Sequence, residues 1–408
     1  MPTRPLSELT EALTPFGRVV ARARVVYDGL GLPRADGAVT LQRGPGVNSV
    51  VAVGPAPGAG AGAGALVALT SAAATLDCGF AISPPVVNAH VHLGLPSRAA
   101  RSRVAVGTAV AVDGSAGVGP GAAVAATRSR LAALAACGTR VIGAVVADAA
   151  AMEFLLAQDE VGGVAYWEVV APREEDADAA FDAAIRDLAR FAALARPGGM
   201  RVGLAPHAPH TVSAPLLARL AAHARAAGLP LAVHVAGSPA ERALHLDGSG
   251  PLAAELAARG ATFRGHGGSP VAYLAELGVL DGAPTLVRAG CVDEDDVRLV
   301  ARAGAVVVHT PRADAAAGCD PFPWTLYARH GVELAFGTES LEGDSDVDVT
   351  VEVATALAAQ GVRLNPRAAV RAAVKGGHKA LGMAPPRVTR GAPAAALVAW
   401  GDAAAPGV

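Results

Sequence analysis

One unit recurs along this chain from about residue 80 onward: an amphipathic helix rich in Ala, Leu and Arg, then a Gly, then a short apolar strand. The clearest copy predicts a helix over 124–136, a stop at Gly138 and a strand over 139–146. With less regular segments included, strands are expected near residues 81–90, 139–146, 162–169, 201–206, 229–235, 284–288, 305–309 and 332–338. Eight such units with continuous apolar strands favour an α/β fold, a (β/α)8 TIM barrel, over the alternative of an open doubly wound sheet.

The two chain ends depart from this pattern. Short alternating apolar runs over 18–53 and one more strand candidate over 391–400 predict a small β-sandwich-like domain built from both ends. We therefore expect a flanking β-domain over 1–75 and 383–408, beside a barrel over 76–382. An Ala/Gly-rich stretch over 55–74 is expected to be a surface loop, because its glycines and prolines break a helix.

Charge and cysteine usage limit the classes of protein. The 408 residues are 52% hydrophobic and 17% charged, with a net charge of −2 and no basic tract, so neither nucleic acid nor an acidic membrane surface is an expected partner. The four cysteines form no Cys-x-x-Cys pair, which argues against a disulfide framework and against a thiolate zinc site. The N-terminus has no apolar segment typical of a secretory signal, and we expect a cytoplasmic protein.

Polar side chains fall repeatedly at the carboxyl ends of the expected strands. The ends of the first, fourth, fifth, sixth, seventh and eighth strands carry His90 and His92, His207, His234, Arg288, His309 and Glu339. Side chains two apart on a strand share a face, so His90 and His92 can aim two imidazoles at one point. A single strand-end histidine is usually structural, but the carboxyl ends of barrel strands meet at one mouth. The set therefore predicts a site there.

Several motifs then resemble the amidohydrolase superfamily, and more narrowly its cytosine deaminase, adenosylhomocysteine deaminase and chlorohydrolase-like branch. They are Pro85-Val-Val-Asn-Ala-His-Val-His, Gly203-Leu-Ala-Pro-His-Ala-Pro-His-Thr-Val-Ser, Val307-Val-His-Thr-Pro-Arg and Gly337-Thr-Glu-Ser. The resemblance covers nearly the whole chain. It implies a hydrolase that attacks an amino-heterocycle or amide, at a non-peptide C–N bond, with metal-activated water.

The resemblance also implies a ligand set. One divalent metal, zinc before iron, would be held by His90, His92, His234 and Glu339, and would lower the pKa of its bound water to about 7. His207 is then the candidate for holding a small-molecule substrate, and Glu339 for serving as both ligand and base. Both lysines, Lys375 and Lys379, lie near the C-terminal end, so a carbamylated-lysine bridge between two metals is excluded and Glu168 is the only carboxylate candidate for a bridge. We expect at most one metal.

Three positions depart from the family pattern. Gly237 stands where a proton-transferring glutamate follows the fifth-strand histidine, and Glu241 is a poor replacement for it. Arg288 stands in place of a histidine, and a guanidinium can neither ligate a cation nor accept a proton. Glu339 replaces an aspartate, and Arg288 and Glu339 could instead pair as a salt bridge. The alternative function is therefore a catalytically impaired homologue that keeps the barrel as a binding or oligomer-forming protein. Loss of the metal stays open at this point, and a homodimer is the oligomer considered.

The other histidines receive structural interpretations. His210 is expected to stabilise a turn, His266 to lie on a loop, and His309 either to orient a neighbour of the site or to pack in the core. Surface positions are expected for His223, His245, His330 and His378.

Overall fold

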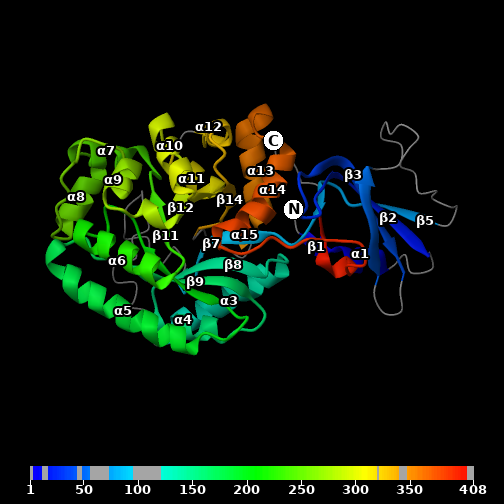
Figure 1. Ribbon diagram of the computed structural model, residues 1–408, viewed down its shortest axis with the longest axis horizontal. Coiled ribbons are helices and arrows are strands. Elements are labelled where there is room, and N and C mark those ends of the chain that lie inside the picture. Colours follow the sequence, from blue (N-terminus) through cyan, green and yellow to red (C-terminus); the bar gives the residue numbers. More distant parts are fainter. Residues whose placement is uncertain are drawn as a thin grey trace.

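The computed structural model describes residues 3–11, 17–43, 48–55, 73–94, 121–318, 321–339 and 347–401. Most of the Ala/Gly-rich stretch over 55–74, expected to be a loop, lies outside the described residues. The described chain forms two parts along its longest axis, with the helix-covered barrel at one end and a β-sheet at the other (Figure 1). Among the described helices, none combines the length and the apolar character needed to cross a membrane.

Eight parallel strands of the described chain build the barrel. They are β7 (Val87–His92), β8 (Val141–Val146), β9 (Gly162–Val169), β10 (Arg201–Pro206), β11 (Ala232–Val235), β12 (Thr285–Arg288), β13 (Val306–His309) and β14 (Leu334–Phe336). β7 to β10 form one four-stranded sheet and β11 to β14 a second. Parallel bridges join Leu204 to Leu231 and Val91 to Glu339, linking β10 to β11 and β14 back to β7. The (β/α)8 barrel predicted from the repeat is confirmed.

Helices follow the strands on the outside. They are α3 (Ala122–Ala136), α4 (Ala149–Leu156), α5 (Ala177–Leu194), α6 (Ala214–Ala227), α7 (Pro239–Asp247), α8 (Pro251–Ala258), α9 (Pro270–Glu276), α10 (Glu294–Ala303), α11 (Pro311–Ala316), α12 (Trp324–Arg329), α13 (Val349–Gln360), α14 (Pro366–Arg371) and α15 (Gly377–Ala380), with a π-helical stretch over Ala372–Gly376. The residues at the two ends of α10 show how the local sequence sets where a helix begins and ends. Asp293 caps it, and a reciprocal bond from Asp296 completes a capping box. Gly304 ends it in the left-handed conformation that favours glycine.

The second part is one mixed sheet. Its strands are β1 (Thr3–Pro5), β2 (Arg18–Val26), β3 (Arg34–Gln42), β4 (Ser49–Pro55), β5 (Ala73–Asp77), β6 (Ala81–Ser83) and β15 (Val398–Trp400), and α1 (Leu6–Glu11) lies between β1 and β2 along the chain. The order is β1-β15-β6-β2-β3-β4, with β5 parallel to β2, so both chain ends contribute. The domain boundaries at 75/76 and 382/383 stay a prediction.

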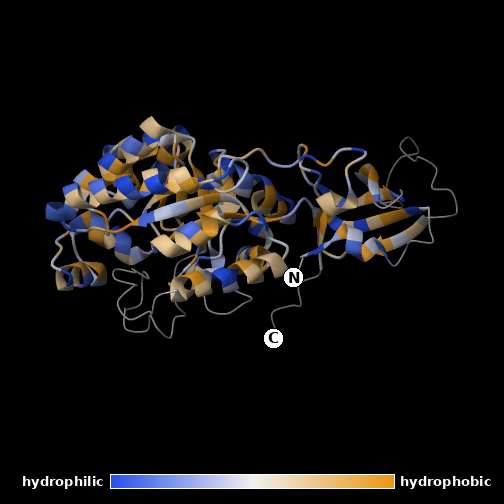
Figure 2. Cartoon of the chain, turned by 90° about the horizontal axis from the view of Figure 1, so that it is seen from below, coloured by the Kyte–Doolittle hydropathy of each residue, from blue (hydrophilic) through white to orange (hydrophobic). Residues whose placement is uncertain are grey.

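One expected strand is in fact two. The apolar run over 81–90 contains Pro84 and Pro85, which cannot donate to a ladder, and the chain changes sheets there. β6 joins the flanking sheet, whereas β7 enters the barrel. Hydrophobic residues concentrate on the strands of both parts, while the helices carry both classes (Figure 2). The short linkage through the two prolines therefore ties the flanking sheet directly to the strand that bears His90 and His92.

Candidate metal centre

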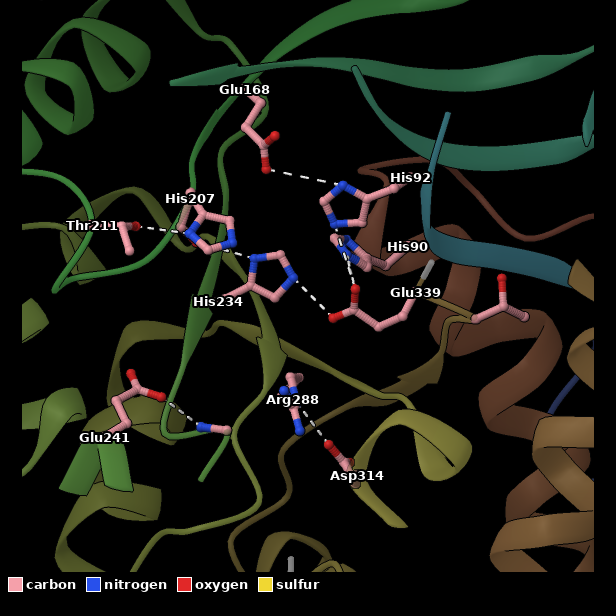
Figure 3. Close-up of polar contacts among 12 residues, drawn as sticks. His90, His92, Glu168, His207, Thr211, His234, Glu241, Arg288, Asp314 and Glu339 are labelled. Carbon is pink, nitrogen blue, oxygen red and sulfur yellow. Dashed lines mark hydrogen bonds and ion pairs between the residues drawn. The ribbon is translucent and has the colours of Figure 1, made fainter. Parts of the chain in front are cut away.

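Three imidazoles and one carboxylate converge at the carboxyl ends of the barrel strands (Figure 3). His90 and His92 come from β7, His234 from β11, and Glu339 follows β14. Glu339 Oε1 lies 2.9 Å from His234 Nε2, and its Oε2 lies 3.5 Å from His92 Nε2 and 3.6 Å from His90 Nε2. One ligand atom from each of the four residues lies within 4.8 Å of all the others. The structure thus brings together all four residues proposed as ligands from the sequence.

Backbone pairing fixes Glu339 beside the two β7 histidines. The amides of Thr338 and Glu339 both donate to the His90 carbonyl, and the His92 amide donates to the Glu339 carbonyl. Glu339 has φ 55°, a left-handed conformation that is uncommon outside glycine and that clusters at functional sites. Asn88 supports the same turn, because its side-chain amide donates to Thr338 Oγ1 at 2.7 Å.

Hydrogen bonds orient the remaining rings. His234 Nδ1 lies 3.0 Å from the His207 carbonyl, so it carries the proton and leaves Nε2 to face Glu339. His207 Nδ1 lies 2.8 Å from Thr211 Oγ1, which in turn donates to the Ala208 carbonyl. The His207 and His234 rings are 5.0 Å apart. His207 is thereby held next to the cluster without belonging to it.

The electrostatics suit a cation. Burial lowers the pKa of His90, although Glu339 opposes the change, and burial also lowers the pKa of His207 well below its ordinary value. Burial alone would raise the pKa of Glu339, but the attraction of His234 and His90 holds that pKa well below its usual value. Burial opposes protonation of His234, but Glu339 outweighs it and raises the His234 pKa, so His234 would release its extra proton when an ion binds. Neutral imidazoles and an ionised carboxylate are the forms that ligate a metal.

The donor set fits one zinc-like ion. Histidine nitrogens and carboxylate oxygens are both zinc ligands, with Zn–N distances of about 2.0–2.1 Å. His90 Nε2 is buried and has no hydrogen-bond partner among the described residues, its separation of 3.6 Å from Glu339 being too long for one. Glu168 lies on the far side of His92, with its carboxylate 4.0 Å from Nδ1, and burial raises its pKa to about 7. Glu168 therefore stands behind a ligand and is not part of the four-residue group.

Arg288 does not pair with Glu339, so that alternative was wrong. The Arg288 Nε donates to Asp314 Oδ1 at 2.8 Å, and both side chains are buried. Glu339 is instead surrounded by imidazoles, while Asp314, at the start of α11, offers Arg288 a closer carboxylate. The second oxygen of Asp314 lies 3.6 Å from His309 Nε2. That separation is too long for a hydrogen bond. His309 packs against Phe322, with ring centroids 4.0 Å apart, and its Nδ1 accepts from Trp324 Nε1 at 3.2 Å, so it takes the core-packing role of the two considered for it.

The side chain of Arg288 fills the volume next to Gly237. A Cβ atom added at Gly237 would lie 3.0 Å from Cδ and from Nε of Arg288. The two positions singled out by the resemblance are therefore spatially linked, because the arginine fills volume that a side chain at 237 would need. Glu241 does not belong to the four-residue group: its carboxylate accepts from the Ala236 and Gly237 amides at 3.0 and 2.8 Å (Figure 3).

The sequence interpretation missed one group of residues. His245 was expected at the surface but is 0% exposed, and His378, also expected there, is 6% exposed with its Nδ1 donating to the Val374 carbonyl. His245 lies within ligand distance of Glu241 and His210. A signal did exist, because Glu241 and His245 are four residues apart on α7, a spacing that places two side chains on the same face of a helix.

Comparison with known proteins gives a consistent result. Residues 81–400 match the model of the Amidohydrolase family. The aminodeoxyfutalosine deaminase of Deinococcus radiodurans is 36% identical over 393 residues, covering 90% of this chain and 86% of that relative. A 5-methylthioadenosine/S-adenosylhomocysteine deaminase of Syntrophobacter fumaroxidans is 33% identical over 194 residues, which is 45% of this chain and 40% of the relative.

Solved structures share the fold. The aminofutalosine deaminase of Helicobacter pylori in complex with methylthio-coformycin aligns with a TM-score of 0.66 at 14% identity, over 92% of this chain and 90% of that chain. An adenosine deaminase of Xanthomonas campestris with bound zinc aligns with a TM-score of 0.60 at 22% identity, over 92% and 83% of the two chains. At these identities the likeness concerns the fold.

Proposed function

The chain belongs to the amidohydrolase family, hydrolases that act on carbon–nitrogen bonds other than peptide bonds, and from this premise we propose that it deaminates an adenosine-like compound at the centre formed by His90, His92, His234 and Glu339. The observation that carries the proposal is the convergence of three imidazoles and a carboxylate at the mouth of the barrel where active sites of this fold lie. The named relatives act on adenosine-like substrates, which supports that substrate class.

The residues of the centre have distinct tasks. A divalent ion held there would supply a hydroxide at neutral pH for attack on the carbon that carries the amino group. His234 presents Nε2 because its Nδ1 proton is bound by the His207 carbonyl. Glu339 is the one carboxylate of the four-residue group, and its second oxygen can take the proton of the attacking water. The water oxygen bonds to that carbon and the bond from the carbon to the amino nitrogen breaks; ammonia leaves with one water proton, and the product keeps an oxo group with the other proton on a ring nitrogen.

His207 and Arg288 flank this chemistry. We assign His207 to the substrate, because Thr211 fixes its Nδ1 and leaves Nε2 to face a polar group. Arg288 stays protonated and cannot exchange protons, so its place in the mechanism is that of a fixed positive charge neutralised by Asp314. Proton transfer to the leaving amine therefore depends on Glu339.

A second candidate function rests on a specific observation. Gly237 offers no side chain, and Arg288 fills the volume beside it. Losing a positioned acid/base group typically costs about 10²–10⁴-fold in rate. The alternative is a homologue that binds a metal and an adenosine-like ligand but turns it over very slowly.

One assay separates the two candidates. Protein loaded with zinc or with iron is incubated with adenosine, 5-methylthioadenosine, S-adenosylhomocysteine or aminodeoxyfutalosine, and ammonia is measured. The proposal expects release from at least one compound, and Glu339→Gln should reduce it by about 10²–10⁴-fold. His223→Gln, on the outer helix α6, is the matched control and should retain the activity. Binding of these compounds without ammonia release would favour the slow homologue instead.

A further inference from the structure

A second cluster of ligand-type side chains lies on the outer side of the strand ends. His210 follows β10, and Glu241 and His245 lie one turn apart on α7. All three are buried, with exposures of 3%, 4% and 0%. One ligand atom from each lies within 4.8 Å of the others, and His210 Nδ1 is 3.9 Å from Glu241 Oε1. None of these atoms belongs to the centre around Glu339.

The imidazoles of this cluster are unsatisfied. Both ring nitrogens of His210 and both of His245 are buried without a hydrogen-bond partner among the described residues. The same holds for His266, whose ring packs edge-on against His245 with centroids 5.4 Å apart. A buried polar group left without a partner costs about 1–3 kcal/mol, and folded proteins rarely leave several together. The cluster therefore requires a partner that the described side chains do not supply.

The donor chemistry indicates a cation as that partner. Burial lowers the pKa of His245 to about 3, and that of His210 is lowered for the same reason, so both rings are neutral and have a lone pair to offer. Glu241 provides a carboxylate whose orientation is fixed by the amides of Ala236 and Gly237. Two imidazoles with one carboxylate is a ligand set that zinc and similar first-row ions accept. Tetrahedral zinc would need donors about 3.4 Å apart, a contraction of about half an ångström from the 3.9 Å between His210 and Glu241.

A cavity borders the cluster at His210. It has a volume of about 460 Å³, and its lining includes His210, Phe263, Arg264 and Tyr273. The Tyr273 ring lies 5.1 Å from that of His245. Because His210 belongs to both the cavity wall and the cluster, an ion could enter from this side without passing through the first centre.

We propose that His210, Glu241 and His245 form a second metal site, for zinc or a similar first-row divalent ion. The site would also hold the loop that follows β11. Glu241 accepts from Ala236, whose φ is 49°, and from Gly237, and these two residues come shortly after the ligand His234. Fixing the carboxylate with an ion would hold that left-handed turn in place.

Metal stoichiometry tests the site independently of deaminase activity. Zinc content is measured by mass spectrometry after dialysis, and cobalt(II) is titrated while its visible absorption is followed. Four proteins are compared: the parent chain, a His90→Asn/His92→Asn variant, a His210→Asn/His245→Asn variant, and the combination of all four substitutions. We expect two equivalents for the parent, one for each double variant and none for the combination. His223→Gln is the matched control and should bind as the parent does.

Each other outcome has a defined meaning. If the His90/His92 variant binds no metal, or if the His210/His245 variant loses none relative to the parent, the second site does not exist and buried water satisfies these rings. If the parent binds one equivalent and only the His210/His245 substitutions remove it, the second site stands and the proposed deaminase centre fails. Circular dichroism checks folding. Should the double variant not fold, Glu241→Gln is used instead, and an unchanged affinity for zinc in that variant would equally overturn the site.

Discussion

Placing a side chain back at position 237 tests whether Gly237 and Arg288 are one coupled change. The backbone of Gly237 is outside the left-handed region, so only space opposes a larger residue there. An added Cβ would lie 3.0 Å from Cδ and Nε of Arg288, closer than ordinary van der Waals contact. These atoms belong to the middle of a buried side chain held to Asp314 at 2.8 Å, so they cannot swing into solvent.

Each single substitution should destabilise the protein. Gly237→Glu overpacks a filled site, at a cost of about 1–3 kcal/mol. Arg288→His removes the guanidinium from Asp314, which is 6% exposed, and breaking a buried pair in this way costs about 3–5 kcal/mol. In the double variant the shorter imidazole vacates the space that the glutamate needs. We expect the double variant to be more stable than the sum of the single effects by about 1–3 kcal/mol.

Urea unfolding measures this coupling, and ammonia release from zinc-loaded protein measures its functional consequence. Only the double variant regains both a proton-transferring carboxylate and a neutral ring, so it alone should gain activity, by about 10²–10⁴-fold over the parent. The control pair combines Arg288→His with Gly54→Glu, since a Cβ at Gly54 meets no atom within 4 Å, and its effects should add. If the effects at 237 and 288 also add to within about 0.5 kcal/mol, the two residues do not share space and the reasoning is refuted.

Two further predictions concern stability and metal affinity. Burial raises the pKa of Glu352 from 4.5 to about 7 despite its bond to Arg312, so the folded state holds the proton more tightly than the unfolded state. The free energy of unfolding should therefore fall by about 3 kcal/mol as the pH rises from 4.5 to 7. Urea titrations at several pH values measure this fall, and Glu352→Gln should remove most of it. If the free energy of unfolding changes equally with pH in the two proteins, the prediction is wrong. Gly337→Ala would bring a Cβ within 2.8 Å of the His90 backbone oxygen. It should therefore weaken zinc binding and lower the free energy of unfolding by about 1–3 kcal/mol. Gly54→Ala is the control and should change neither, because a Cβ there meets no atom within 4 Å.

The barrel could be predicted because its signals are local. The helices of the clearest repeats end at a glycine, and Gly228 and Gly304 indeed adopt the left-handed conformation at the ends of α6 and α10. The strand over 81–90 was misjudged as one element, because apolar periodicity does not show where a chain leaves one sheet for another. Pro84 and Pro85 were the available sign, since neither can donate a ladder hydrogen bond.

The candidate ligands could also be predicted, because parallel strands bring their carboxyl ends to one mouth. What could not be predicted was which partner each charged side chain would find. The sequence allowed Arg288 to pair with Glu339, and only the placement of Asp314 on α11 decides otherwise. The spacing of Glu241 and His245 does place them on one face of a helix, but the burial of that face depends on how α7 packs against neighbouring elements and not on the polarity of its own sequence.

The partner of Arg288 bears on which function is retained. Because Asp314 neutralises the guanidinium, Glu339 remains bound among His90, His92 and His234. A buried cluster of three imidazoles and a carboxylate is costly to fold unless its polar atoms are satisfied, and a metal ion satisfies them at once. A barrel that had lost its metal would be more stable with apolar residues at these positions. We therefore expect Gly237 and Arg288 to affect proton transfer beside the centre and not its capacity to hold an ion, so the deaminase and the slow homologue should differ in turnover while both bind metal.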